Sequence, residues 1–228
     1  MDIIGHQKIS FIDYPEKICT VLFLGGCNFR CSYCHNGPIV HADGNSLSQE
    51  KIFRFLKKRR KFLDGVCISG GEPTLYEEIY DLIDRIKKEG FLVKLDTNGT
   101  NPKLLKRLLH NRMLDYIAMD VKAPFNKYNQ IVGAEVDIKV IEESIHMVMN
   151  SSVEYEFRTT VGKEILSIED IRSISELIKG STRYYLQNFH DRDTVLNGKG
   201  QLHPYEKEIL VGIIKDIEHN FGTCKLRG

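Results

Sequence analysis

The sequence predicts an α/β fold, an open, partial (β/α)6 TIM-like barrel built on a parallel sheet. Six short apolar runs rich in β-forming residues alternate with stretches of helical periodicity, which is the pattern of βαβ units. Six units are fewer than the eight that close such a barrel, so the sheet is expected to stay open. A flat, doubly wound sheet is the competing arrangement. The 228 residues include no low-complexity stretch or linker, so we expect one domain over 1–228.

The expected strands are apolar segments bounded by polar or glycine-containing turns. They cover 17–24, 65–69, 91–96, 114–121, 153–161 and 182–189, and a further short strand is expected at 222–226. The expected helices occupy the intervals, at 48–60, 75–89, 102–111, 137–150, 167–179 and 204–218. Ser48 and Ser167 are candidate N-caps, Pro102 suits a first helical turn, and Gly90 and Gly180 are candidate helix ends.

Composition narrows the function class. Lys and Arg number 32 against 31 Asp and Glu, so the net charge of +1 gives no reason to expect a nucleic-acid partner. The basic run at 57–61 (KKRRK) is interpreted as the solvated end of a helix. No apolar stretch approaches the ~20 residues of a membrane span, and the N-terminus lacks the pattern of a secretory signal. We therefore expect a cytoplasmic protein whose cysteines serve metal binding or catalysis before disulfides.

Three cysteines form the most informative cluster in the chain. Cys27, Cys31 and Cys34 follow the expected strand 17–24 and a Gly-Gly pair, and functional sites gather at the carboxyl ends of parallel strands. Structural zinc normally has four protein ligands, and the adjacent His35 is poorly placed to complete a set of four. A four-iron cluster is ordinarily held by four cysteines. Three would leave one iron open to a substrate or cofactor, while a zinc site of three cysteines and a histidine is the alternative.

The other three cysteines are isolated. Cys19 and Cys67 lie in apolar strand runs, where a thiol packs as a small hydrophobic group. The sequence leaves the role of Cys224 undecided.

The cysteine spacing, with aromatic Tyr33 just before the third cysteine, resembles the signature of radical S-adenosylmethionine (radical SAM) enzymes. That resemblance implies a radical SAM core in which Cys27, Cys31 and Cys34 bind a 4Fe–4S cluster. A second stretch, Gly70-Gly71-Glu72-Pro73, follows the next expected strand. By itself it is also consistent with a turn and a helix cap. In the family the equivalent stretch contacts the methionyl amino group of SAM, and Glu72 could accept from that ammonium.

Two further motifs resemble the activating enzymes of glycyl radical enzymes. Asp96-Thr97-Asn98-Gly99 ends the third expected strand and alternatively forms an Asx turn. Asp120 and Lys122 end the fourth expected strand and alternatively form a surface ion pair. The resemblance implies that Asp96, Thr97, Asn98, Asp120 and Lys122 help to hold SAM. It also allows a monovalent cation near Asp96 and Asp120.

Three more residues are candidates for cofactor contacts. Arg158 lies in an otherwise apolar strand, where an unpaired charge is costly, so it either meets the cofactor carboxylate or forms a salt bridge within the barrel. His190 matches in position a histidine near the adenosyl group in the pyruvate formate-lyase activating type. His35 is placed beside the cluster and is expected to contact or shield it.

The run 10–15 (SFIDYP), together with the CNFRC-x-YCHN stretch, resembles the activating proteins of anaerobic ribonucleoside-triphosphate reductase. The resemblance implies an electron donor such as flavodoxin or ferredoxin, reductive cleavage of SAM to a 5′-deoxyadenosyl radical, and hydrogen abstraction from a glycine of that partner enzyme. Activation of pyruvate formate-lyase or another glycyl radical enzyme is an alternative. A radical SAM enzyme acting on a small molecule is another, which polar residues converging inside the barrel beyond the SAM site would favour.

Overall fold

The computed structural model describes residues 1–42 and 44–227, and their strands form one eight-stranded sheet in the order β1 to β8. The strands are β1 (Ile3–Ser10), β2 (Cys19–Leu24), β3 (Gly65–Gly70), β4 (Leu92–Thr97), β5 (Tyr116–Asp120), β6 (Glu154–Val161), β7 (Arg183–Asn188) and β8 (Thr223–Arg227). Strands β2 to β8 are parallel neighbours in chain order, and β1 pairs antiparallel with β2.

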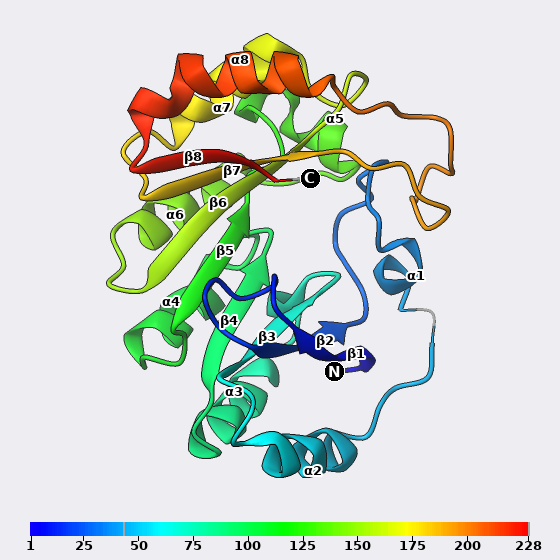
Figure 1. Ribbon diagram of the computed structural model, residues 1–228, viewed down its shortest axis with the longest axis vertical. Helices are drawn as coiled ribbons and strands as arrows, with labels where there is room; N and C mark the ends of the chain where they lie inside the picture. Colours follow the sequence, from blue (N-terminus) through cyan, green and yellow to red (C-terminus); the bar gives the residue numbers. More distant parts are fainter. Residues whose placement is uncertain (43, 228) are drawn as a thin grey trace.

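The longer helices cover one face of this sheet. Figure 1 shows the sheet curving from β1 to β8, with α2, α3, α4, α6, α7 and α8 on its outer side. The helices are α1 (Gly37–Val40), α2 (Gln49–Arg59), α3 (Ile79–Lys88), α4 (Pro102–His110), α5 (Tyr128–Val132), α6 (Ile138–Met149), α7 (Ile168–Leu177) and α8 (Lys207–Ile217). Short 3-10 turns lie at Pro73–Leu75, Phe125–Lys127 and Glu218–Asn220. A doubly wound sheet would carry helices on both faces, so the open partial barrel is confirmed.

The strand β1 was not predicted, and it adds an antiparallel edge to the expected six-strand core. Its sequence, IIGHQKIS, lacks a regular apolar alternation, and its middle residues are exposed or half-buried. Only its two ends, Ile3 and Ser10, are buried. Backbone pairing with β2, rather than burial of its side chains, therefore defines this strand. Backbone pairing does not require an apolar pattern, so the sequence contained little indication of a strand here.

Two capping predictions had different outcomes. Ser167 begins α7 with a full capping box, because its hydroxyl accepts from the Asp170 backbone N–H and the Asp170 carboxylate accepts from the Ser167 backbone N–H. Ser48 precedes α2, but its hydroxyl donates to Glu50 at 2.6 Å instead of capping the backbone. Ser48 therefore occupies the predicted N-cap position, but its side chain does not cap the helix. Gly90 follows α3 at φ +87°, a conformation suited to a helix end.

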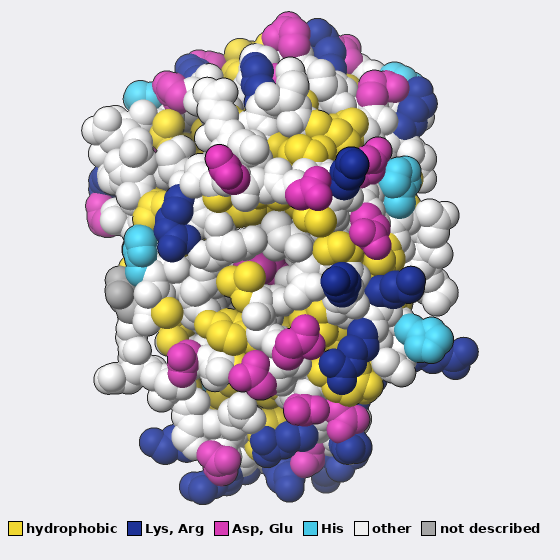
Figure 2. All heavy atoms as spheres, turned by 180° about the vertical axis from the view of Figure 1, so that it is seen from behind, with side chains coloured by type: hydrophobic (Ala, Val, Ile, Leu, Met, Phe, Trp, Pro, Cys, Tyr) yellow, Lys and Arg dark blue, Asp and Glu magenta, His cyan; other side chains and the backbone are white. Residues whose placement is uncertain are grey.

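All residues of the basic run at 57–61 are exposed, as predicted. Figure 2 shows Lys and Arg side chains gathered at the lower end of the molecule, where α2 lies in Figure 1. No helix in the described part of the chain is long and apolar enough to cross a membrane.

On β4 the period-two alternation separates apolar outer residues from polar inner ones. On β4, Val93 and Leu95 are buried in the main hydrophobic core, which also contains apolar residues of the outer helices. The intervening Lys94 and Asp96 point to the inner side of the curved sheet, where Asp96 lines a cavity. The inner face of this barrel therefore supplies polar groups to the site.

Candidate functional site

One cavity of about 490 Å³ collects nearly all of the residues predicted from the sequence. It lies at the carboxyl ends of β2 to β6, where the loops after the strands meet. The predicted residues that line it are Cys27, Cys31, Tyr33, Cys34, His35, Gly70, Gly71, Glu72, Asp96, Thr97, Asn98, Asp120, Lys122 and Arg158. The lining also includes residues that sequence reasoning missed, among them Asp13, Ser69, Thr160, Gln187 and Arg192. Ser69 immediately precedes Gly70, and its position next to the motif was the available signal.

The three cysteines of the motif surround this cavity on the loop after β2. Cys31 is buried, and Cys27 and Cys34 are half-buried. Burial raises the pKa of the Cys27 thiol to about 11 and also raises the pKa of Cys31, so these thiols need nearby positive charge to become thiolates. Bound metal ions supply such positive charge, and thiol ligands therefore release their protons when they bind a metal.

The donor set fits a cluster better than a single ion. Within 1–42 and 44–227, no three His, Cys, Asp or Glu side chains converge as ligands of one metal ion. A cluster of several irons binds each thiolate at a different iron, so it requires thiols arranged around one cavity rather than converging on a point. Tyr33 lies in the lining of the same cavity, and its buried hydroxyl makes no hydrogen bond among the described residues. A group bound in the cavity would supply the missing partner.

Glycines bring the loop after β3 against the cysteine loop. Gly71 donates its backbone N–H to Leu24 at 2.9 Å, and the Glu72 N–H donates to the carbonyl of Gly26 at 2.9 Å. A Cβ on Gly71 would lie 1.9 Å from that carbonyl oxygen, and a Cβ on Gly70 would lie 2.2 Å from the Leu24 oxygen. Glycine is therefore required at both positions, because the Cβ of any other residue would overlap the neighbouring backbone.

A Gly71→Ala variant tests this packing. The added methyl group overlaps the Gly26 carbonyl, so the two loops must separate. We expect a loss of about 1–3 kcal/mol in unfolding free energy from overpacking, together with reduced iron binding. Urea denaturation and iron analysis measure both. A Gly212→Ala variant, at an exposed position of α8 with nothing within 4 Å of the new Cβ, is the matched control; it should bind iron as the wild-type protein does and gain up to about 1 kcal/mol in unfolding free energy.

Glu72 joins the loops after β3 and β4. Its side chain is completely buried, and its Oε1 accepts from the backbone N–H and hydroxyl of Thr74 and from the Thr97 hydroxyl at 2.8 Å. Its Oε2 accepts from the Asn98 backbone N–H at 2.6 Å. Burial raises the pKa of this carboxyl, and the four donors act in the opposite direction. Glu72 thus locks together two motifs that the sequence presented separately.

A chain of alternating charges crosses the inner face from β4 to β6. Arg158 bridges the two aspartates, with Nη1 at 3.3 Å from Asp96 and Nε at 2.8 Å from Asp120. Lys122 pairs with Asp120 at 2.9 Å, and Lys94 pairs with Asp96. Arg158 was expected either to meet the cofactor carboxylate or to form a salt bridge within the barrel. The salt bridge is present, and Arg158 also lines the cavity.

This array stays charged near neutral pH. Burial alone would raise the pKa of Asp120, but Arg158 and Lys122 lower it to about 2. The same interactions raise the pKa of Lys122. Sequence reasoning missed Lys94, although the argument applied to Arg158, a charge within an apolar strand, applies equally to FLVKLD.

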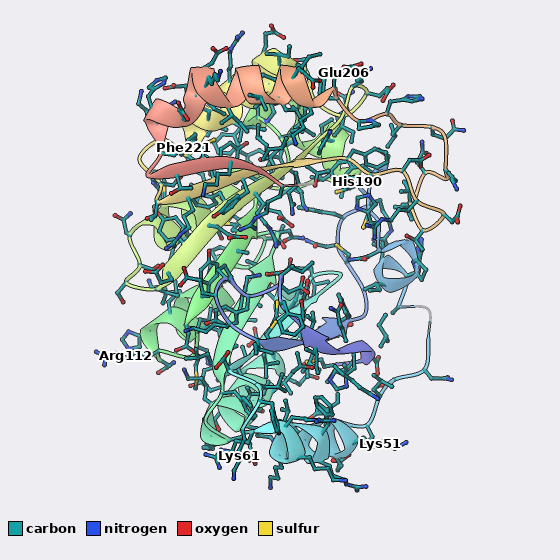
Figure 3. All side chains as sticks on the ribbon, viewed as in Figure 1. Lys51, Lys61, Arg112, His190, Glu206 and Phe221 are labelled. Atoms are coloured by element: carbon teal, nitrogen blue, oxygen red, sulfur yellow. The ribbon has the colours of Figure 1, made fainter. Side chains whose placement is uncertain are left out.

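His35 and His190 lie together at the edge of the site. The His35 Nε2 is 2.6 Å from the backbone carbonyl oxygen of His190, and the His35 ring stacks on Phe189 with centroids 5.4 Å apart. Figure 3 shows His190 just beyond the end of β7, near the cysteine loop. Its side chain is exposed and is not part of the cavity lining, so its contact with SAM stays a prediction.

The segment after His190 is largely exposed but is tied to the cysteine loop. The backbone N–H of Leu196 donates to the Cys34 carbonyl at 2.9 Å, and the Asn197 N–H donates to the Ser32 carbonyl at 3.0 Å. The loop therefore fixes the position of the third cysteine from the opposite end of the sheet.

Comparisons with known proteins agree with this site. The model of the radical SAM superfamily matches residues 21–178. A Methanocaldococcus jannaschii protein provisionally named a glycyl-radical enzyme activating enzyme is 38% identical over 83% of this chain and 80% of its own length. The pyruvate formate-lyase-activating enzyme of Clostridium pasteurianum is 27% identical over 93% of this chain and 88% of its own.

Solved structures share the fold. Streptococcus suis SuiB bound to its precursor peptide SuiA superposes with a TM-score of 0.69 at 16% identity, covering 91% of this chain and 48% of that one. A domain of a pyruvate-formate lyase-activating enzyme from Bacteroides vulgatus gives a TM-score of 0.58 at 18% identity, covering 72% of this chain and 99% of that one. With the three-cysteine loop, the glycine-rich loop and the match over most of the sheet, the chain belongs to the radical SAM superfamily.

Proposed function

We propose that this enzyme activates a glycyl radical enzyme by removing a hydrogen atom from a glycine of that partner. The balanced change consumes one electron and one SAM, and yields methionine, 5′-deoxyadenosine and a glycyl radical. The observation that carries the proposal is the convergence of three thiols and a charged array on one cavity. The similarity to a provisionally named activating enzyme over most of the chain supports it.

The chain's own residues bind and orient the reactants. Cys27, Cys31 and Cys34 would hold a 4Fe–4S cluster, which with bound SAM supplies the one-electron chemistry. Lys122 and Arg158 line the cavity with positive charge suited to the carboxylate of SAM. The backbone around Gly70 and Gly71, held against the cysteine loop, is suited to a polar group of the same ligand. The comparisons with known proteins give no support for the monovalent cation predicted near Asp96 and Asp120.

Anaerobic ribonucleoside-triphosphate reductase is the partner we propose. The segment at 10–15 that carries this resemblance leads directly into the site, because Asp13 lines the cavity. Pyruvate formate-lyase is the second candidate, favoured by the similarity to the Clostridium pasteurianum activating enzyme. Flavodoxin or ferredoxin in the cytoplasm is the proposed electron donor.

Anaerobic activation assays test the proposal. The reconstituted enzyme is mixed with SAM, a reductant and each candidate partner in turn, and glycyl radical is measured by electron paramagnetic resonance. We expect a radical signal on the reductase and matching 5′-deoxyadenosine. A signal on pyruvate formate-lyase alone would assign the second candidate. Rapid 5′-deoxyadenosine formation with a small molecule, and no radical on any partner, would overturn the proposed function.

A further inference from the structure

Lys94 is a buried cation that has no role in the predicted site. Its side chain is 2% exposed and sits on β4, two residues before Asp96 and on the same face of the sheet. The ammonium contacts Asp96 Oδ1 and lies 3.8 Å from the Cys67 sulfur and 5.9 Å from the centre of the Tyr116 ring. Lys94 is not part of the cavity lining, so it acts on the site through Asp96.

Lys94 completes the pairing of the two aspartates. Asp96 Oδ1 accepts from Lys94, and Asp96 Oδ2 accepts from Ser69 at 3.1 Å and from Arg158 at 3.3 Å. The Asp120 oxygens accept from Arg158 at 2.8 Å and from Lys122 at 2.9 Å. Each of the four carboxylate oxygens thus already has a protein donor. A metal cation would need at least some of these oxygens as ligands.

The charge balance also opposes an added cation. Lys94, Arg158 and Lys122 carry three positive charges against the two negative charges of Asp96 and Asp120. A further cation would enter an array that is already positive, at a buried position where charges are weakly screened. An ammonium tethered to β4 also avoids the loss of translational freedom that a bound ion pays.

We propose that Lys94 is a built-in counter-ion that replaces an exchangeable monovalent cation beside Asp96, so that this enzyme binds SAM without K⁺ or Na⁺. The inference rests on the proposed function only in taking SAM as the ligand. It assigns to Lys94 a positioning role: the fixed ammonium holds the Asp96 carboxylate, which in turn holds Arg158 toward the cavity.

The first test compares cations on the unmodified enzyme. SAM affinity is measured by equilibrium dialysis on the anaerobically reconstituted protein in KCl, NaCl and choline chloride of equal concentration. We expect dissociation constants within about twofold of one another, because a cation that binds no site shifts no equilibrium. Tighter binding in KCl or NaCl than in choline chloride, by about tenfold or more, would overturn the proposal.

The second test removes the ammonium. In Lys94→Met, which keeps the length of the side chain, we expect SAM affinity in choline chloride to fall by about tenfold or more, since a buried charge loses its partner. KCl should restore part of that affinity. KCl should also raise the melting temperature of the cluster-free variant above its value in choline chloride, because a cation that binds the folded state stabilises it. The cluster-free wild-type protein should melt equally in both salts.

Two further variants make the result specific. Lys87→Met removes a lysine paired with Asp115 at 2.6 Å, away from the cavity, and should show no difference between KCl and choline chloride. Lys94→Arg keeps the charge and should remain indifferent to the cation. Should Lys94→Met fail to fold, the cation comparison on the unmodified enzyme still decides the proposal. A folded Lys94→Met without any K⁺ effect would refute the inference. These measurements need no partner protein, so they stand apart from failure of the glycyl radical assay.

Discussion

A Cys31→Ala variant is expected to lose its cluster iron and to form no 5′-deoxyadenosine above the level seen without enzyme. Cys31 is the middle cysteine of the motif, is 5% exposed and belongs to the cavity lining. The cofactor carries the difficult chemistry in enzymes of this kind, so loss of one of three ligands removes the activity rather than reducing it. Iron analysis of the reconstituted protein and chromatography of the reaction products measure both effects.

Cys224→Ala is the matched control for that experiment. Cys224 lies on β8, is half-buried, and is not part of the cavity lining. This variant should keep about four irons, the content of one 4Fe–4S cluster, and should cleave SAM as the wild-type protein does. Iron retained in Cys31→Ala, or iron lost in Cys224→Ala, would show that the ligand set has been assigned wrongly.

An Arg158→Met variant is expected to lose about 3–5 kcal/mol of unfolding free energy, because Asp96 and Asp120 both lose a charged hydrogen-bond donor at a buried position. Arg158 is the only described residue that pairs with both Asp96 and Asp120, and its side chain is 13% exposed. Urea denaturation of the cluster-free protein measures the loss. SAM affinity should fall as well, since the cavity loses one of its two lining cations from the array.

Arg172→Met provides the comparison with an exposed pair. Arg172 contacts Asp216 at 2.8 Å, and both side chains are more than half exposed. Such surface pairs contribute about 0–1 kcal/mol, so this variant should unfold close to the wild-type midpoint. Equal destabilisation by Arg158→Met and Arg172→Met would contradict the interpretation of a buried array.

The same array makes the protein sensitive to acid. Arg158 and Lys122 lower the pKa of Asp120 below its ordinary value. Stability gained from this carboxylate is therefore fully present above the unfolded value of about 4, and is lost as pH falls toward about 2. The unfolding free energy of the wild-type protein should decrease over this interval, and that of Arg158→Met should decrease less. Chemical denaturation at several acidic pH values measures the difference, and equal slopes would contradict it.

Local signals predicted much of this protein. The cysteine loop is contiguous, so its spacing and the Gly-Gly pair before it predicted the three thiols as candidate cluster ligands. The strands β2 to β7 were found because each is a short apolar run followed by a helical stretch, and the direction of a parallel sheet then placed the strand ends together. β1 was missed because its register depends on pairing with β2, not on its own side chains.

The side-chain contacts between strands could not be predicted from local sequence patterns. Glu72 and Asn98 are 26 positions apart, and Asp96 and Arg158 are 62 apart. Which of them meet depends on the register of neighbouring strands, for example the alignment of Asp120 with Arg158 across β5 and β6. Lys94 illustrates the consequence, because its charge was visible in the sequence but its partner was not.

The sequence by itself therefore determined the superfamily, the three thiols and the set of strand-end residues, because each is carried by residues close together in the chain. Only the tertiary structure decided that Glu72 joins two loops, that Arg158 bridges two aspartates, that Lys94 completes their pairing and that the side chain of His190 lies outside the cavity. The physical reason is that buried charges are tolerated only with partners, and the curvature and register of the sheet select those partners across long separations.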